Sequence, residues 1–139
     1  MYTNAYIATV SSHLDRLLVY KQVFGQHIAS CERILCGKCL ATENTQSLAN
    51  HLLRNLARFV PFASEVKNMP VPEEYAEMHA GILAGLNRYE TALNHIFVAM
   101  QGTQLDQRLF LTGVSEQERA LATIDFQYFD NLRYGDIGA

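Results

Sequence analysis

Three cysteines and one histidine lie close together near position 30, and no other group of side chains in this sequence is better suited to bind a metal. Cys31, Cys36 and Cys39 follow the spacing Cys-x4-Cys-x2-Cys, and His27 precedes Cys31 by about one helical turn. Thiolate and imidazole are the ligands that zinc and other thiophilic metals prefer. One hypothesis is therefore a metal- or redox-responsive protein that uses His27, Cys31, Cys36 and Cys39.

The same cysteines allow a plainer interpretation. A redox dithiol needs its nucleophilic cysteine at a helix N-terminus, where the helix dipole stabilises the thiolate. Cys36 is instead expected at a helix C-terminus, just before Gly37. Cys31 would then fill a core position, as free cysteines often do, and Cys36 and Cys39 would belong to a cap and turn. We favour this interpretation, and it predicts no cofactor.

Tyr20, His79 and Tyr89 are polar side chains that fall within or next to rows of apolar residues with helical spacing, which we call apolar seams. Buried tyrosines usually combine apolar packing with one hydrogen bond, and we expect His79 to be satisfied in the same way. A weaker alternative is a small ligand held by these three residues in the interior. The sequence contains no Gly-rich phosphate loop, nucleophile elbow or catalytic carboxylate pair, so it gives no positive sign of an enzyme.

Apolar residues recur in alternating steps of three and four along four segments, which predicts amphipathic helices rather than strands. Pro61 falls inside the second pattern, which continues beyond it, so we expect a kink there. The sequence Ser115-Glu116-Gln117-Glu118 matches a capping box and predicts the start of the last helix. The expected helices are 4–36, 45–67, 72–101 and 115–133, with a short further helix at 104–111.

Four helices with short connections predict an all-α fold, an antiparallel up-down-up-down four-helix bundle that forms a single domain over residues 1–139. Two features stand outside its apolar seams. Small residues form a row on the third helix, which would let another helix approach closely. Polar residues of the second helix lie opposite its seam and are expected to be solvated. The two sets are Gly81, Gly85, Ala92 and Ala99, and His51, Arg54, Asn55 and Arg58.

Composition limits the function further. The 139 residues are 49% hydrophobic and only 18% charged, and a charge-poor surface is typical of a surface covered by a partner. A net charge of −3 argues against nucleic acid. We expect no membrane span and no signal peptide, and the odd cysteine count favours the cytoplasm. The sequence therefore predicts a non-enzymatic protein that binds a protein partner or itself, for example as a homodimer.

Overall fold

The computed structural model describes residues 2–35, 45–101, 105–124 and 126–128 of the chain, and within these ranges the structure is all-helical without strands. The all-α prediction is thus confirmed. Gly37, the expected stop after the first helix, lies outside the described residues. The helices are α1 (Tyr2–Leu35), α2 (Thr45–Asn68), α3 (Ala76–Ala99) and α4 (Gln107–Ala120), with the short 3₁₀ helices η1 (Glu73–Tyr75) and η2 (Leu121–Thr123).

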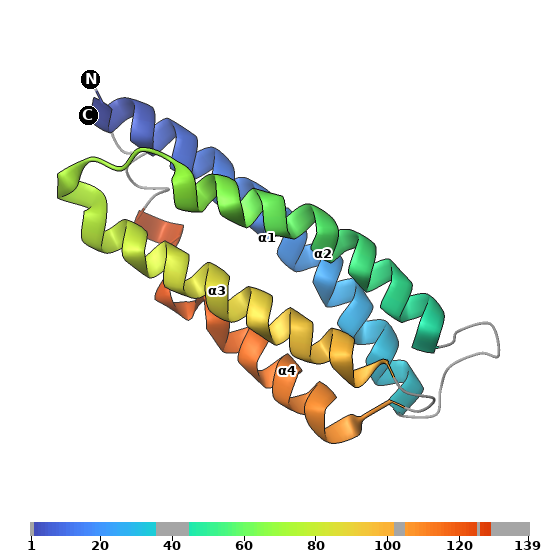
Figure 1. Cartoon of the computed structure of the whole chain (residues 1–139). Coiled ribbons are helices and arrows are strands. Elements are labelled where there is room, and N and C mark those ends of the chain that lie inside the picture. Colours follow the sequence, from blue (N-terminus) through green and yellow to red (C-terminus); the bar gives the residue numbers. More distant parts are fainter. Residues whose placement is uncertain (1, 36–44, 102–104, 125, 129–139) are drawn as a thin grey trace.

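The first two helices lie against each other along much of their length (Figure 1). Arg16 bonds to Glu65 and Tyr20 bonds to the carbonyl of Arg58, so the two helices run in opposite directions. The second helix continues through Pro61 without ending. Proline interrupts only its own backbone donor and crowds the preceding turn, and the exposed position of Pro61 leaves the buried side of α2 intact.

The third helix begins slightly later than predicted. Pro72 precedes the 3₁₀ helix η1, and the amide of Tyr75 donates to the Pro72 carbonyl oxygen at 2.9 Å. The regular α-helix then starts at Ala76 and ends at Ala99. Proline suits this entry because its fixed φ angle is already close to the helical value and its missing amide is not needed in a first turn.

The predicted start of the last helix at Ser115 is wrong. α4 begins at Gln107, where the side chain of Asp106 accepts a hydrogen bond from the amide of Leu109 at 3.1 Å. The segment expected to hold a short separate helix is thus the first part of α4, which passes through Gly113. α4 ends at Ala120 and is followed by η2, after which the backbone of Ile124 is extended. The predicted helix 115–133 is therefore not continuous.

The core lies between α1, α2 and α3, with apolar side chains of α4 closing one side. Its centre is a group of aromatic rings from three helices, in which Phe24, Phe59 and Tyr89 contact one another with centroids 5.6 to 6.1 Å apart. α4 contributes Phe110, which is fully buried. Burying one such side chain stabilises a fold by about 1.5–3 kcal/mol, so these rings fix how the first three helices pack.

Candidate functional site

The predicted metal ligands His27 and Cys31 lie one turn apart on α1 but have different neighbours. The Nε2 atom of His27 accepts a hydrogen bond from Nδ2 of Asn55 on α2 at 3.0 Å. The thiol of Cys31 is buried and donates to the sulfur of Met100 at 3.5 Å. Burial, with a smaller contribution from Glu32, raises the pKa of Cys31 to about 11. Cys31 is therefore a protonated core thiol.

A further histidine, His51 of α2, comes close to His27, with ring centroids 5.3 Å apart. Burial, and to a smaller extent His51 itself, lowers the pKa of His27, so its imidazole is neutral near pH 7. Cys36 and Cys39 lie outside the described residues. Within the described part of the chain, no group of three His, Cys, Asp or Glu residues is placed to hold a metal ion.

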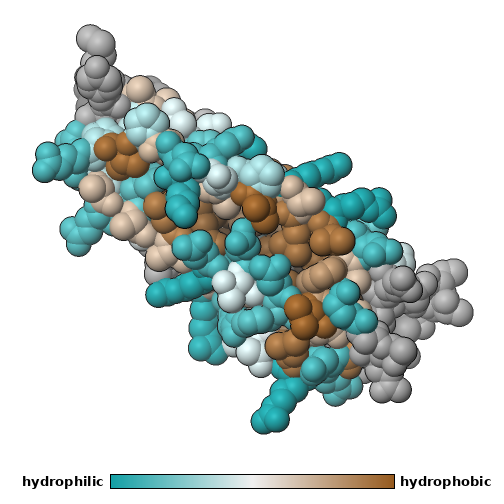
Figure 2. Space-filling view, viewed as in Figure 1, coloured by the Kyte–Doolittle hydropathy of each residue, from teal (hydrophilic) through white to brown (hydrophobic). Residues whose placement is uncertain are grey.

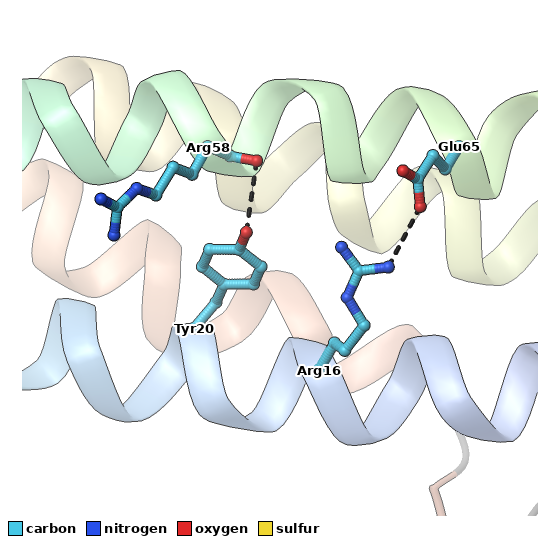
Figure 3. A network of polar contacts seen from close by, with 4 residues as sticks. All are labelled: Arg16, Tyr20, Arg58 and Glu65. Atoms are coloured by element: carbon cyan, nitrogen blue, oxygen red, sulfur yellow. Dashed lines mark hydrogen bonds and ion pairs between the residues drawn. The ribbon is translucent and has the colours of Figure 1, made fainter.

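The expected solvated face of α2 is partly an interhelical face. Asn55 contacts α1 through His27, and the carbonyl of Arg58 accepts a hydrogen bond from the hydroxyl of Tyr20 at 3.2 Å. Figure 3 shows this bond beside the ion pair of Arg16 with Glu65. The sequence pattern missed this arrangement because Tyr20 is long enough to reach the backbone of the neighbouring helix from the edge of its own seam.

His79 joins three helices through its ring. Its Nε2 donates to the carbonyl of Val66 near the end of α2, and its Nδ1 accepts from the hydroxyl of Tyr6 on α1, both at 3.0 Å. The Val66 carbonyl is one of the last four of its helix, which have no partner within the helix. Burial, with a contribution from Tyr75, raises the pKa of Tyr6 to about 12. His79 is thus a satisfied structural histidine.

Tyr89 is fully buried, and its hydroxyl has no hydrogen-bond partner among the described residues. Burial raises its pKa. The rings of Tyr20 and Tyr89 both pack on Phe24 and Phe59, but only the Tyr20 hydroxyl has a partner among the described residues, the carbonyl of Arg58. His79 instead bonds to Tyr6 and Val66. Within the described part of the chain, none of these three residues lines the groove between α3 and α4 or the groove between α1 and the segment 69–72.

The predicted row of small residues on α3 lies partly against α4. A Cβ at Gly113 of α4 would lie 2.7 Å from Cγ1 of Ile96 and 3.1 Å from the carbonyl oxygen of Ala92. The carbonyl of Ala99 accepts a hydrogen bond from the amide of Asp106, just before α4. Gly85 is buried and Gly81 is half-buried. The backbones of α3 and α4 thus approach closely around Ala92.

Beside this contact, α3 and α4 form an open groove of about 910 Å³ that the sequence analysis did not identify. Arg88, Arg108 and Arg119 line it, together with His95, whose Nδ1 lies 2.8 Å from a carboxylate oxygen of Glu116. The sequence provided little indication of this groove, because its residues come from two helices. The pattern of one helix does not show how that helix is aligned with another.

A second surface feature is a strip on α2 that carries no charge. Leu53, Ala57, Val60 and Ser64 follow one another at steps of three and four and are exposed. Leu53 and Val60 expose 49% and 48% of their surface. They lie roughly 140–160° around the helix from Arg58, on the side away from α1. Figure 2 shows apolar surface along the seam between α2 and α3.

None of the helices in the described ranges combines the length and apolar character needed to cross a membrane. Comparison of the chain with known protein families, with curated proteins and with solved structures finds no match.

Proposed function

We propose that this chain is a non-enzymatic, antiparallel four-helix bundle that works as a homodimer, with the uncharged strip of α2 as its interface. The observation that carries the proposal is the half exposure of Leu53 and Val60, which belong to a strip of four exposed residues, from position 53 to 64, that are all uncharged. Single exposed apolar residues are ordinary on a protein surface. An exposed strip without charges over about 16 Å, with two large apolar residues in it, is better explained by a covering partner.

The order of side chains along the strip favours a second copy of the same chain as that partner. Small Ala57 lies between the larger Leu53 and Val60, so the strip has a similar shape in both directions. In a two-fold dimer, residue i of one copy contacts residue j of the other and the reverse, and only a residue at the axis faces its own counterpart. Two α2 helices packed in opposite directions would place the Ala57 pair at the axis and Leu53 of one copy against Val60 of the other.

Neighbouring parts of α3 would extend this interface. Leu83 and Phe97 are half-buried and pack against the edge of the core. Stable dimers bury roughly 1,200–2,000 Å² in total, which is more than a single helix strip of this length provides. We therefore expect the contact to include the α2–α3 seam seen in Figure 2.

Light scattering after size-exclusion chromatography at two protein concentrations tests this proposal. The expected mass is twice the 15.7 kDa of the chain, and Val60→Glu should convert the dimer to a monomer by placing a charge at the interface. Val19→Glu is the matched control, because Val19 is an exposed valine of α1 with 60% of its surface accessible. A monomer at both concentrations, or equal effects of the two variants, would contradict the proposal.

Cysteine cross-linking tests the position of the two-fold axis. In a Cys36→Ser, Cys39→Ser background, Ala57→Cys should form a disulfide-linked dimer under mild oxidation, because the two copies of residue 57 would face each other. Val19→Cys should stay monomeric on a non-reducing gel. If both variants cross-link at the same rate, the link reports random collision rather than an α2–α2 contact.

The closeness of His27 and His51 supports a second candidate function, which is binding of a thiophilic metal such as zinc. The imidazoles of His27 and His51, from α1 and α2, can share one ion, and zinc usually takes four ligands. Cys36 and Cys39 are the further ligands in this proposal. Cys31 is left out, because its thiol bonds to Met100 in the core.

Cobalt(II) titration of untagged, chelator-treated protein tests metal binding, because its absorption bands distinguish thiolate from imidazole ligands. The expected result is one bound ion per chain with thiolate bands that disappear in Cys36→Ser, Cys39→Ser. His27→Gln should weaken binding at least tenfold, and His13→Gln is the control. Absence of any spectral change at millimolar cobalt would exclude this function.

A further inference from the structure

We propose that the groove between α3 and α4 binds a small organic phosphate, with Arg88 and Arg119 as the residues that hold the phosphate group. The groove has a volume of about 910 Å³, within the range of roughly 300–1,000 Å³ that is common for small-molecule sites. It lies on the side of α3 that faces α4, so it is separate from the α2 strip proposed above as a dimer interface.

The charge of the groove is opposite to that of the whole chain. The protein carries 11 Lys and Arg against 14 Asp and Glu. The groove is lined by three arginines and one carboxylate, that of Glu116, which is already bonded to His95. Arg88 and Arg108 form no ion pair with a described residue, and Arg119 bonds only to the Ser115 hydroxyl at 2.7 Å. Guanidinium groups that form no ion pair with a described residue favour an anionic ligand when they share one groove.

The register of the two helices brings the Cα atoms of Arg88 and Arg119 to the same level. Gly113 of α4 lies against both Ala92 and Ile96 of α3, and the helices run in opposite directions from that point. Arg88 is four to eight residues before these contacts and Arg119 is six residues after Gly113. The Cα atoms of both therefore lie about 9 Å along the axis from the contact, at the same end of the groove. The guanidinium of Arg119 reaches back by one turn toward the contact, where it bonds to Ser115.

Two arginines that line the same end of one groove suit a phosphate monoester better than a carboxylate. Guanidinium forks donate paired hydrogen bonds to phosphate oxygens. A phosphate monoester carries a charge of about −1.5 to −2 near pH 7 and three terminal oxygens, so it can engage both forks at once. The hydroxyl of Thr91, which also lines the groove, is a further donor on α3.

The remainder of the ligand would lie toward the other end of the groove. Leu111 lines this part and exposes 57% of its surface, which provides an apolar contact for the organic part. Arg108 lies about 7–8 Å along the axis from Gly113 in the direction away from Arg119. The site is thus suited to a phosphate ester whose organic part is apolar near its centre and carries a polar or anionic group at its far end.

Titration of ¹⁵N-labelled full-length protein with phenyl phosphate, followed by NMR, tests the site. The expected result is saturable chemical-shift changes confined to residues of α3 and α4 that line the groove. Benzoate, the carboxylate for comparison, should bind at least tenfold more weakly. Inorganic phosphate should bind at the same end but more weakly, because it lacks an organic part to contact Leu111. Shifts that never saturate, or equal binding of benzoate, would overturn the proposal.

Substitutions separate this site from general attraction of anions. Arg88→Gln and Arg119→Gln should each weaken phenyl phosphate binding at least tenfold, and Arg88→Lys should weaken it less because it keeps the charge. Arg54→Gln is the matched control, since Arg54 is an exposed arginine of α2. A loss in Arg54→Gln as large as in the groove variants would contradict the assignment. The mass measured by light scattering should be the same in all of these variants. A loss of phosphate binding then cannot result from a change at the proposed α2 interface.

Discussion

Between α1 and α2 the contacts are made by long side chains, whereas α3 and α4 meet through their backbones. Tyr20 of α1 spans the distance to the Arg58 carbonyl, and its ring packs on Phe59 and Phe62 of α2 with centroids 5.3 and 5.2 Å away. On the other side of the molecule, Gly113 leaves no room for even one carbon atom beside Ile96. The same fold thus contains one pair of helices spaced by rings and one pair in close contact.

This difference decides where each pair tolerates change. In a pair spaced by rings, removal of a ring leaves a cavity, while small additions at the edge meet solvent. In a pair in close contact, an added methyl group has nowhere to go, because neighbouring backbone atoms cannot rotate away as side chains do. The two pairs should therefore respond to opposite kinds of substitution.

The largest effect is expected from removing a ring between α1 and α2. Phe59 is fully buried and contacts Phe24 and Tyr89, so Phe59→Ala should lower the free energy of unfolding by about 3–5 kcal/mol. Urea unfolding followed by circular dichroism measures this. Val19→Ala, at an exposed position of α1, should change stability by less than about 0.5 kcal/mol. Comparable losses in the two variants would mean that the rings do not form the core described here.

A smaller but more specific loss is expected from Gly113→Ala in the α3–α4 pair. The new Cβ would lie 2.7 Å from Ile96 Cγ1 and 3.1 Å from the Ala92 carbonyl oxygen. We expect a loss of about 1–3 kcal/mol, although alanine normally favours a helix. At Gly25 of α1 a Cβ would meet nothing within 4 Å, so Gly25→Ala should stabilise the protein by about 0.5–1 kcal/mol. A gain at both positions would contradict the close contact.

The helix seams show what could be predicted from the sequence. Val10, Leu14 and Phe24 follow the spacing of three and four residues that predicts one apolar side of the first helix, and all three are buried. Such a pattern is local, because it depends only on the geometry of one helix. The same reasoning failed at Gly113, which falls between the predicted helices 104–111 and 115–133 but lies inside α4. Only the position of α3 beside it explains a glycine in mid-helix, and a single helix pattern does not contain that information.

The candidate site was less predictable for the same reason. Arg88 and His95 lie outside the apolar seam of α3, as do many solvated residues, and nothing in their spacing links them to Arg119 or Glu116 on a later segment. The groove exists because the two helices meet at a particular register. His51 was missed in a similar way, since it became notable only through its distance of 5.3 Å from His27 on the preceding helix.

A moderate gain in stability is expected where the third helix meets the aromatic core. The hydroxyl of Tyr89 is buried without a partner among the described residues, and leaving such a group unsatisfied costs about 1–3 kcal/mol. Tyr89→Phe should therefore raise the free energy of unfolding by about 1 kcal/mol. Tyr6→Phe is the control with the opposite sign, because the Tyr6 hydroxyl bonds to His79. Destabilisation by Tyr89→Phe would show that this hydroxyl has a hydrogen-bond partner, such as a bound water molecule.

The smallest effect is expected from the ion pair at the outer edge of the α1–α2 contact. Arg16 and Glu65 lie 3.0 Å apart, but their side chains are 47% and 57% exposed, and exposed pairs usually contribute about 0.2–1 kcal/mol. A double-mutant cycle with Arg16→Gln and Glu65→Gln should give a coupling energy in this range that falls as salt is added. Arg16 also lies over the ring of Phe62, 4.7 Å from its centroid, so Arg16→Gln should cost more than Glu65→Gln. If the two single variants are equal and the coupling is zero, the polar edge does not hold α1 to α2, and the rings alone set the spacing of the pair.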